Sequence, residues 1–349
     1  MYLYFIKLKE LLNEPSSLDL SADFLPLNHS KKPPLLIYGK ALGEAILKSS
    51  DFIPMNLIDY FKVINNKPNT TFPSIDLYFN ESPLFLNNQG QSDARKALSL
   101  LYKNMEDKLL EWLPSFTKNY FADIEIRWVD NPNRIAEQYT LGIFKKMILT
   151  ELDCKEDMSI EFPGAIANMY KSAKDLESYD RKLSLLFKFI EDKLLLVKRP
   201  PEDAWKIVSV VIMGTEAISN TLGYSMIMNE RHENKWDAQT LVEEVTPISF
   251  TGRLSTKDTQ INNLTIQVGQ EVYVSFHLIN KIKSLQDKPS EKSNALAFGI
   301  GKHMCPGRKI SLIIIQTFLD EWERFKGIKI NSSHISYSRD LVFRLKENI

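Results

Sequence analysis

Cysteine and net charge are the two things this 349-residue sequence has least of. Its only cysteines are Cys154 and Cys305, too few for a disulfide framework, and they fit a reducing cytoplasm. We therefore expect a cytoplasmic protein with a cysteine available for chemistry. Because 44 Lys and Arg balance 44 Asp and Glu, the composition gives no argument for nucleic acid or an anionic membrane as a partner.

Long apolar runs are also missing. No stretch approaches the roughly 20 apolar residues that span a bilayer, and the most apolar segments are interrupted by Lys, Glu or Asn. The N-terminal segment MYLYFIKLKELLNEPSS has no positive leader, long apolar core or small-residue cleavage site. We expect a soluble protein without membrane contact. With 44% hydrophobic residues, the chain can bury a large core without metals or disulfides.

The residue pattern predicts a mainly α-helical chain with small β-sheets. Residues 1–90 have Pro and Asn clusters and little helical period, which predicts short strands and loops around a few helices. Apolar spacing further along predicts helices at 91–112, from 131, at 165–198, 202–229, 237–245 and 306–325. Alternation predicts a small antiparallel sheet over 250–276 and a strand at 341–345. We expect one domain over 1–349, with a β-rich and loop part at 1–90 and a helical part at 91–349.

The segment from Phe298 to Arg308 carries the strongest chemical signal. It is FGIGKHMCPGR, with Cys305 at the N-cap of a helix predicted to begin at Pro306. Unpaired N–H groups and the positive end of the helix dipole stabilise a thiolate there. Three glycines let the backbone turn tightly and approach a flat ligand, namely Gly299, Gly301 and Gly307. Taken alone, these residues favour a plain turn before a helix.

The order Phe-Gly-x-Gly-x-His-x-Cys-x-Gly-Arg closely resembles the ligand loop of the cytochrome P-450 family. The resemblance covers residues 200–349 well and the first half loosely. It implies a cytochrome P-450-like fold reduced in size, in a short and divergent bacterial-type member. It also implies heme b (iron protoporphyrin IX) with the axial thiolate of Cys305 as the metal ligand. The implied heme-binding residues of the loop are Phe298, Gly299, Gly301, His303, Cys305 and Gly307.

By the same resemblance, the predicted helix 202–229 passes over the oxygen-binding face. Gly214 and Glu216 match the family's Gly-x-acid-Thr pattern, but Ala217 stands where the family usually has threonine. These three are the candidate catalytic residues. Cleaving O–O needs proton donors, and only the acid is in place. Nearby alcohols could substitute, although none shares the azimuth of Ala217: Thr215, Ser219 and Thr221. Glu216 could instead satisfy a helix bend or cap the backbone.

Three further side chains resemble heme contacts of the family. Arg253 and His303 resemble residues that hold the propionates, where a cation or N–H donor neutralises a carboxylate. Arg95 resembles the arginine of a His-x-x-x-Arg contact, with Gln91 in place of the histidine. Each could instead be a solvated surface residue.

One departure from the family is larger. Its Glu-x-x-Arg pattern would fall at 242–247, where no arginine follows Glu244. In the family this arginine pairs with the glutamate and a second arginine, and so braces the proximal side. Since no arginine occurs between Arg253 and Arg308, the brace is predicted to be absent. Glu243 and Glu244 are then expected to be exposed or bonded to lysines.

The resemblance implies a heme-thiolate oxidoreductase, a monooxygenase that oxidises a small organic substrate in a biosynthetic pathway. An acidic ferredoxin or flavodoxin would donate electrons at a basic patch of Lys302, Arg308 and Lys309, which an ordinary solvated surface explains equally well. Ala217 favours an alternative enzyme that uses peroxide or catalyses a redox-neutral dehydration or rearrangement. The missing arginines favour a noncatalytic heme-binding protein of the same fold, against which the intact Cys305 and Glu216 argue.

Overall fold

The computed structural model describes residues 2–19, 21–55, 70–123, 132–155, 173–231, 236–285, 296–324, 335–339 and 343–347. The chain forms two compact units, each assembled from segments far apart in the sequence. Unit 1 comprises Met1–Met55, Gln239–Cys305 and Ser336–Lys346, and unit 2 comprises Asn56–Ala238, Pro306–Ile335 and Glu347–Ile349. A single domain over 1–349 stays a prediction.

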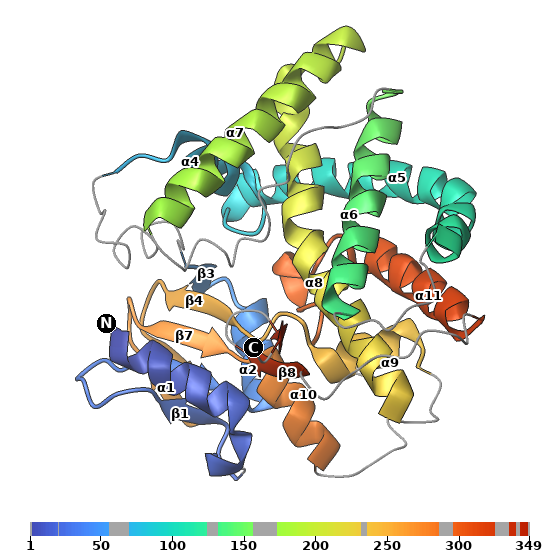
Figure 1. Ribbon diagram of the computed structural model, residues 1–349. Helices are drawn as coiled ribbons and strands as arrows, with labels where there is room; N and C mark the ends of the chain where they lie inside the picture. The colour runs from blue at the N-terminus through green and yellow to red at the C-terminus, as the bar shows by residue number, and fades with distance from the viewer. Residues whose placement is uncertain are drawn as a thin grey trace. The chain divides into compact units, whose positions relative to one another are not determined.

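Unit 1 is built on a five-stranded sheet with the strand order β1-β2-β7-β4-β3, seen in Figure 1. The strands are β1 (Phe24–Pro26), β2 (Leu35–Ile37), β3 (Phe52–Pro54), β4 (Thr251–Ser255) and β7 (Glu271–Val274). Within this sheet only β2 and β7 pair in parallel, with Leu36 opposite Tyr273. Every residue of β2 is buried, as expected for a strand covered on both faces. The sheet therefore joins the beginning of the chain to residues 251–274.

Helices cover both faces of this sheet. Because successive side chains of a strand point to opposite faces, Leu35 and Ile37 pack in one cluster with Ile46, and Leu36 packs in another with Leu8. The helices of unit 1 are α1 (Tyr2–Asn13), α2 (Lys40–Lys48), α9 (Ala238–Val245) and α10 (Phe276–Leu285). Two short pairs of strands complete it: β5 (Thr259–Ile261) with β6 (Leu264–Ile266), and β8 (Ile335–Arg339) with β9 (Phe343–Glu347).

Unit 2 is helical. Its helices are α4 (Pro73–Glu81), α5 (Asn88–Asp123), α6 (Pro132–Glu151), α7 (Ala173–Leu196), α8 (Ala204–Arg231) and α11 (Arg308–Arg324). Helix α8 is apolar nearly all round, as the sequence predicted for a helix crossing an interior, and it runs alongside α6 (Figure 1). An aromatic cluster joins α5, α6 and α11, in which the ring of Phe318 lies 5.1 Å from Phe121 and 5.0 Å from Tyr139.

The predicted fold class, mainly α with small sheets, is confirmed. The helix predicted at 91–112 is longer than expected, because Leu113, Thr117 and Phe121 continue its buried face past Pro114. The predicted start of the next helix at 131 and the part of the third at 165–172 lie outside the described residues. Among the helices described, none combines the length and apolar character needed to cross a membrane.

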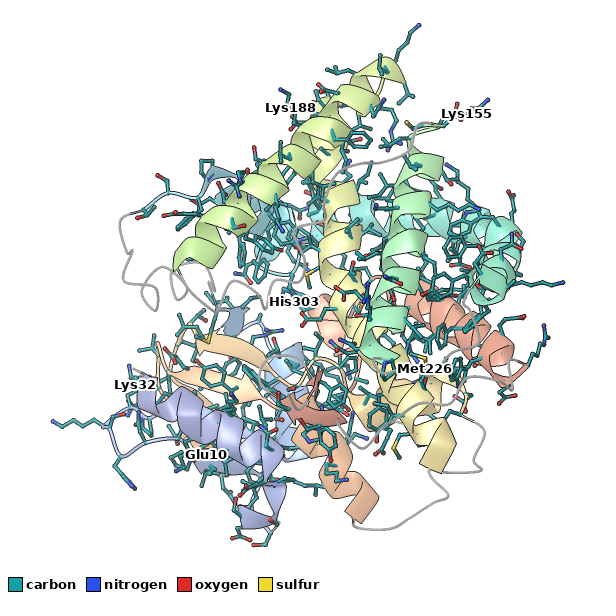
Figure 2. The ribbon with its side chains drawn as sticks, viewed as in Figure 1. Glu10, Lys32, Lys155, Lys188, Met226 and His303 are labelled. Atoms are coloured by element: carbon teal, nitrogen blue, oxygen red, sulfur yellow. The ribbon has the colours of Figure 1, made fainter. Side chains whose placement is uncertain are left out.

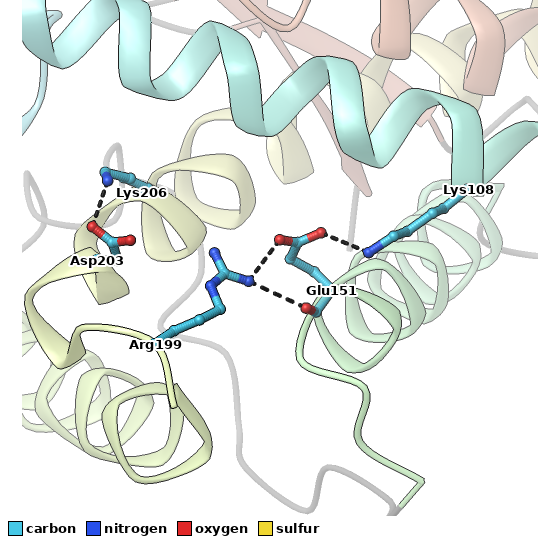
Figure 3. A network of polar contacts seen from close by, with 5 residues as sticks. All are labelled: Lys108, Glu151, Arg199, Asp203 and Lys206. Carbon is cyan, nitrogen blue, oxygen red and sulfur yellow. Dashed lines mark hydrogen bonds and ion pairs between the residues drawn. The ribbon is translucent and has the colours of Figure 1, made fainter. Parts of the chain in front are cut away.

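A polar network ties α5, α6 and the segment after α7 together (Figure 3). The side chain of Glu151 is only 6% exposed, and its carboxylate accepts Lys108 Nζ at 3.0 Å and Arg199 Nη1 at 2.8 Å. Arg199 also donates to the backbone carbonyl of Glu151 at 3.3 Å. This carbonyl belongs to the last turn of α6, where carbonyls have no partner within the helix. Lys206 and Asp203 form a separate ion pair beside it.

Candidate functional site

The cysteine loop, residues 296–305, lies in unit 1 and is shaped by its own backbone. Gly299 N donates to Leu296 O at 2.8 Å, and Cys305 N donates to Phe298 O at 2.8 Å. Gly299 and Gly301 have φ of +69° and +72°, a left-handed conformation that favours glycine. The tight turn predicted from these glycines is therefore confirmed. The contact of the loop with a flat ligand stays a prediction.

Cys305 is half-buried and precedes α11 in the chain, but it is not the N-cap of that helix. The first helical bond runs from Ser311 N to Gly307 O at 2.9 Å, and the helix begins at Arg308. The N-cap is therefore Gly307, two residues after the cysteine, and the predicted N-cap position of Cys305 is wrong. The positive end of the α11 dipole is therefore near Gly307, two residues further along the chain than Cys305.

The rest of the loop packs within unit 1. A Cβ on Gly301 would lie 3.2 Å from Leu47 O, so the loop backbone lies directly against the end of α2. His303, labelled in Figure 2, ends a short 3₁₀ turn (Gly301–His303) and is half-buried. Phe298 is half-buried as well. Contact of either side chain with a ligand stays a prediction.

Arg253 is the side chain of unit 1 that most clearly lacks a counter-ion. It lies on β4, is 4% exposed, and donates to Thr251 Oγ1 at 2.8 Å and Gly252 O at 2.9 Å. Both acceptors are neutral, and no carboxylate pairs with Arg253 within the described residues. Burial lowers the pKa of Arg253 to about 10. A buried cation without an anion is costly, so this position suits an anionic group such as a heme propionate.

The segment of α8 predicted to be catalytic lies in unit 2. A Cβ on Gly214 would lie 2.6 Å from Phe144 Cζ of α6, so close helix packing alone accounts for this glycine. Glu216 is half-buried. Its carboxylate raises the pKa of Tyr179, after the larger effects of burial and of Tyr78. Glu216 therefore lies close enough to Tyr179 of α7 for its charge to act on that hydroxyl.

Ala217 is flanked by alcohols whose protons point to the helix backbone. Thr215 Oγ1 donates to Val211 O at 2.6 Å, and Thr221 Oγ1 donates to Ala217 O at 2.7 Å. Ser219 donates to Glu216 O at 3.2 Å. Such bonds to the preceding turn are common for Ser and Thr within helices. The three alcohols considered as substitutes thus donate within α8.

The remaining predicted residues of unit 2 occupy two helices. Arg95 is half-buried on α5, and Gln91 one turn earlier is 4% exposed. Gly307 packs against Tyr102 of α5, whose ring would lie 3.2 Å from an added Cβ. In the predicted basic patch, Lys302, Arg308 and Lys309 are all exposed, and Lys309 pairs with Glu106.

The end of α9 holds a feature that sequence reasoning missed. Arg339 of β8 is buried and donates to Val245 O at 2.7 Å and to Thr246 O at 3.2 Å. An arginine at this position was not expected, and the absence of the Glu-x-x-Arg brace stays a prediction. The arginine is more than 90 residues away, so no local motif could reveal it. Glu244 is exposed as predicted, and Glu243 is half-buried and accepts a bond from Gln239.

No family model matches the sequence, and no curated protein sequence matches it. Solved structures do match. P450BioI in complex with a fatty-acid-ligated acyl carrier protein is 16% identical with a TM-score of 0.68, covering 90% of this chain and 93% of that one. P450 RauA with a biosynthetic intermediate of aurachin RE is 12% identical with a TM-score of 0.70, covering 99% and 97%. A cytochrome P450 from Thermus thermophilus is 14% identical with a TM-score of 0.69, covering 96% and 94%. The chain therefore has the cytochrome P450 fold over nearly its whole length.

Proposed function

We propose that this chain is a heme-thiolate oxidoreductase of the cytochrome P450 type, with the thiolate of Cys305 as the axial ligand of heme b. The observation that carries the proposal is the loop that ends at Cys305, with Gly299 and Gly301 in left-handed conformations, in a chain with this fold. Arg253 adds support, because it is buried and cationic and its acceptors among the described residues are neutral. It would hold a propionate, and His303 would hold the other.

The other residues are assigned by resemblance to the family. Phe298, Gly307 and Arg95 would contact the cofactor. When bound, heme supplies the redox chemistry with which the enzyme oxidises a small organic molecule. A biosynthetic role is in keeping with RauA, which was solved with a biosynthetic intermediate.

The test is spectroscopic. We expect one heme per chain and a reduced carbon-monoxide band at the position typical of thiolate ligation. Cys305→Ala should abolish that band, whereas Cys154→Ala, which removes the other cysteine, should keep it. Retention of the band in Cys305→Ala would contradict the proposal. A spin-state shift on adding substrate would separate a working pocket from a noncatalytic heme carrier.

Ala217 favours a second candidate, an enzyme that uses peroxide or catalyses a redox-neutral reaction. Ala217 cannot donate a proton, and the neighbouring alcohols donate to helix carbonyls. Turnover driven by dioxygen would then depend on the Glu216 carboxyl holding a proton, with water or a substrate hydroxyl passing it on. Ala217→Thr should raise product formed per NAD(P)H if dioxygen is used. With peroxide or without an oxidant, it should leave turnover flat or lower it.

Electron delivery gives an independent test. Lys302 and Arg308 are exposed, so reversing either charge should raise the KM for an acidic ferredoxin or flavodoxin, most strongly at low salt. An unchanged KM after reversal of each of the three charges Lys302, Arg308 and Lys309 would argue against a patch at this loop.

A further inference from the structure

Thr246, the residue that follows α9, has a backbone that threonine rarely adopts. Its φ is +42°, in the left-handed region where helices often end but where glycine is the usual residue. A β-branched side chain in this region is strained. Thr246 is nevertheless fully buried, and its N–H donates to Val242 O at 2.8 Å. Contacts from elsewhere must hold it in this conformation.

One such contact comes from the end of the chain. The guanidinium of Arg339 binds the carbonyls of Val245, the last residue of α9, and of Thr246, which follows it, and lies 4.7 Å from the ring centre of Phe343. A cation at a helix C-terminus is favourable, and it also satisfies carbonyls that have no helical partner. Asn13 fixes the backbone of Arg339, accepting its N–H at 2.9 Å and donating to its carbonyl at 2.8 Å.

The side chain of Thr246 extends this contact toward the cysteine loop. Its hydroxyl donates to Glu243 O at 2.7 Å and accepts from Asn280 Nδ2 at 2.9 Å. The Oδ1 of Asn280 in turn accepts the N–H of Leu296 at 3.2 Å. Leu296 begins the loop and accepts the N–H of Gly299 at 2.8 Å. Glycine at 246 would relieve the strain but remove the hydroxyl that links α9 to Asn280.

We infer that Arg339, Thr246 and Asn280 form a brace that positions the cysteine loop, in place of the arginine missing from the Glu-x-x-Arg pattern. Each member is buried or half-buried in unit 1, and each bond is between atoms of that unit. The three residues are positioning residues, since they act on Cys305 through Leu296 and the loop backbone. The geometry of the brace stands apart from the proposed function, but its value for heme binding rests on that function.

Hydrogen exchange of the full chain as purified tests the brace directly. Thr246→Val keeps the branched shape and removes the hydroxyl, which bonds to Glu243 and Asn280 and so reaches the loop only through Asn280. We expect the amides of Gly299 and Cys305 to exchange about tenfold faster, as for the loss of one buried hydrogen bond. Thr246→Ser, which retains the hydroxyl, should restore slow exchange. Arg339→Met should act in the same direction as Thr246→Val.

Gln270→Ala is the matched control. Gln270 is also buried in unit 1, and its side chain also makes two backbone bonds, accepting Gln267 N at 2.9 Å and donating to Pro33 O at 2.8 Å. Neither bond reaches the cysteine loop. If the loop amides exchange no faster in Thr246→Val than in Gln270→Ala, the inference is overturned. This comparison does not need Arg339→Met, so it remains informative if that variant fails to fold.

Transfer of heme to apomyoglobin provides the second measurement. We expect Thr246→Val, but not Thr246→Ser, to lose heme about tenfold faster, in line with a loosened ligand loop. If the loop amides respond as expected while Cys305→Ala keeps its carbon-monoxide band, the brace stands and the proposed function fails. If the band depends on Cys305 but the amides do not respond, the function stands and the brace fails.

Discussion

The cysteine loop of unit 1 and the middle of α8 in unit 2 both depend on polar side chains that bind backbone carbonyls, but the donors come from different distances. In α8, Thr215 and Thr221 bind carbonyls four residues back in the same helix. At the end of α9, the donor is Arg339, 93 and 94 residues from its acceptors. The side-chain hydrogen bonds of Thr215 and Thr221 in α8 are thus local in sequence, whereas the support of the cysteine loop depends on tertiary structure. Substitutions far from the loop in sequence should disturb it.

The sharpest way to test this difference is to remove the buried cation of unit 1. Arg253→Met should weaken heme binding roughly ten- to a hundredfold, because a charge-assisted bond to a propionate is worth about 1.5–3 kcal/mol. Without heme, the same change should leave stability to urea unchanged or higher, since it removes a desolvated charge without a carboxylate partner among the residues described.

Lys257→Met is the control for the Arg253 experiment, because Lys257 follows the same strand but is exposed and paired with Asp51 at 3.0 Å. Its substitution should alter neither heme loss nor stability by much. A similar loss of stability for Arg253→Met with and without heme would contradict the propionate assignment.

His277, at the start of α10, should make unit 1 sensitive to acid. Burial first, and then the charges of Arg339 and Lys281, lower the pKa of His277 to about 2. In the unfolded chain the pKa of a histidine is about 6.5, so below that pH only the unfolded chain gains this proton. Stability should fall by about 1.4 kcal/mol per pH unit below about 6.5, or about 2 kcal/mol between pH 7 and 5. Urea unfolding at several pH values measures the slope.

His277→Asn should flatten that pH dependence, and His29→Asn, at an exposed site, should not. An unchanged slope in His277→Asn would mean that the acid sensitivity has another source.

Features that depend on local sequence could be predicted, whereas features that depend on tertiary contacts could not. The helices, the small sheets and the turn at Gly299 and Gly301 follow from periodicity and from local backbone rules, and they were predicted. The N-cap of α11 was misplaced, because it depends on where the first helical bond forms. The brace could not be predicted, since Arg339 is separated from Thr246 by most of the C-terminal part of the chain. Nor could the sequence show that Arg253 is buried without a carboxylate partner among the described residues, because burial depends on the tertiary structure.

Helix packing in unit 2 gives a smaller effect. Gly214→Ala places a Cβ 2.6 Å from Phe144 Cζ. The cost of overpacking, about 1–3 kcal/mol, should exceed the gain of about 1 kcal/mol in helix propensity. We expect a net loss of about 1 kcal/mol, measured by urea unfolding and reversed by adding Phe144→Leu. Gly90→Ala is the control, because Gly90 is on α5 with nothing within 4 Å of an added Cβ, and this change should stabilise slightly.

The smallest expected effect on stability concerns the polar network around Glu151. Substitutions there test whether unit 2 also depends on donors that are distant in sequence. Arg199 binds both the carboxylate and the carbonyl of Glu151, whereas Lys108 binds the carboxylate alone (Figure 3). Lys108 is also the more exposed of the two, at 43% against 32%, so solvent screens its charge more. Arg199→Met should cost about 1 kcal/mol and Lys108→Met about 0.5 kcal/mol or less.

A double-mutant cycle over Lys108 and Arg199 completes the test, because the two cations share one carboxylate. Each cation should therefore contribute more to stability when the other has been removed. We expect the double variant to lose more than the sum of the single losses, since it leaves the 6%-exposed Glu151 side chain without either cation. Additive losses would show that each pair is a separate surface contact. In that case tertiary polar contacts matter mainly in unit 1, and the contrast between the two units becomes sharper.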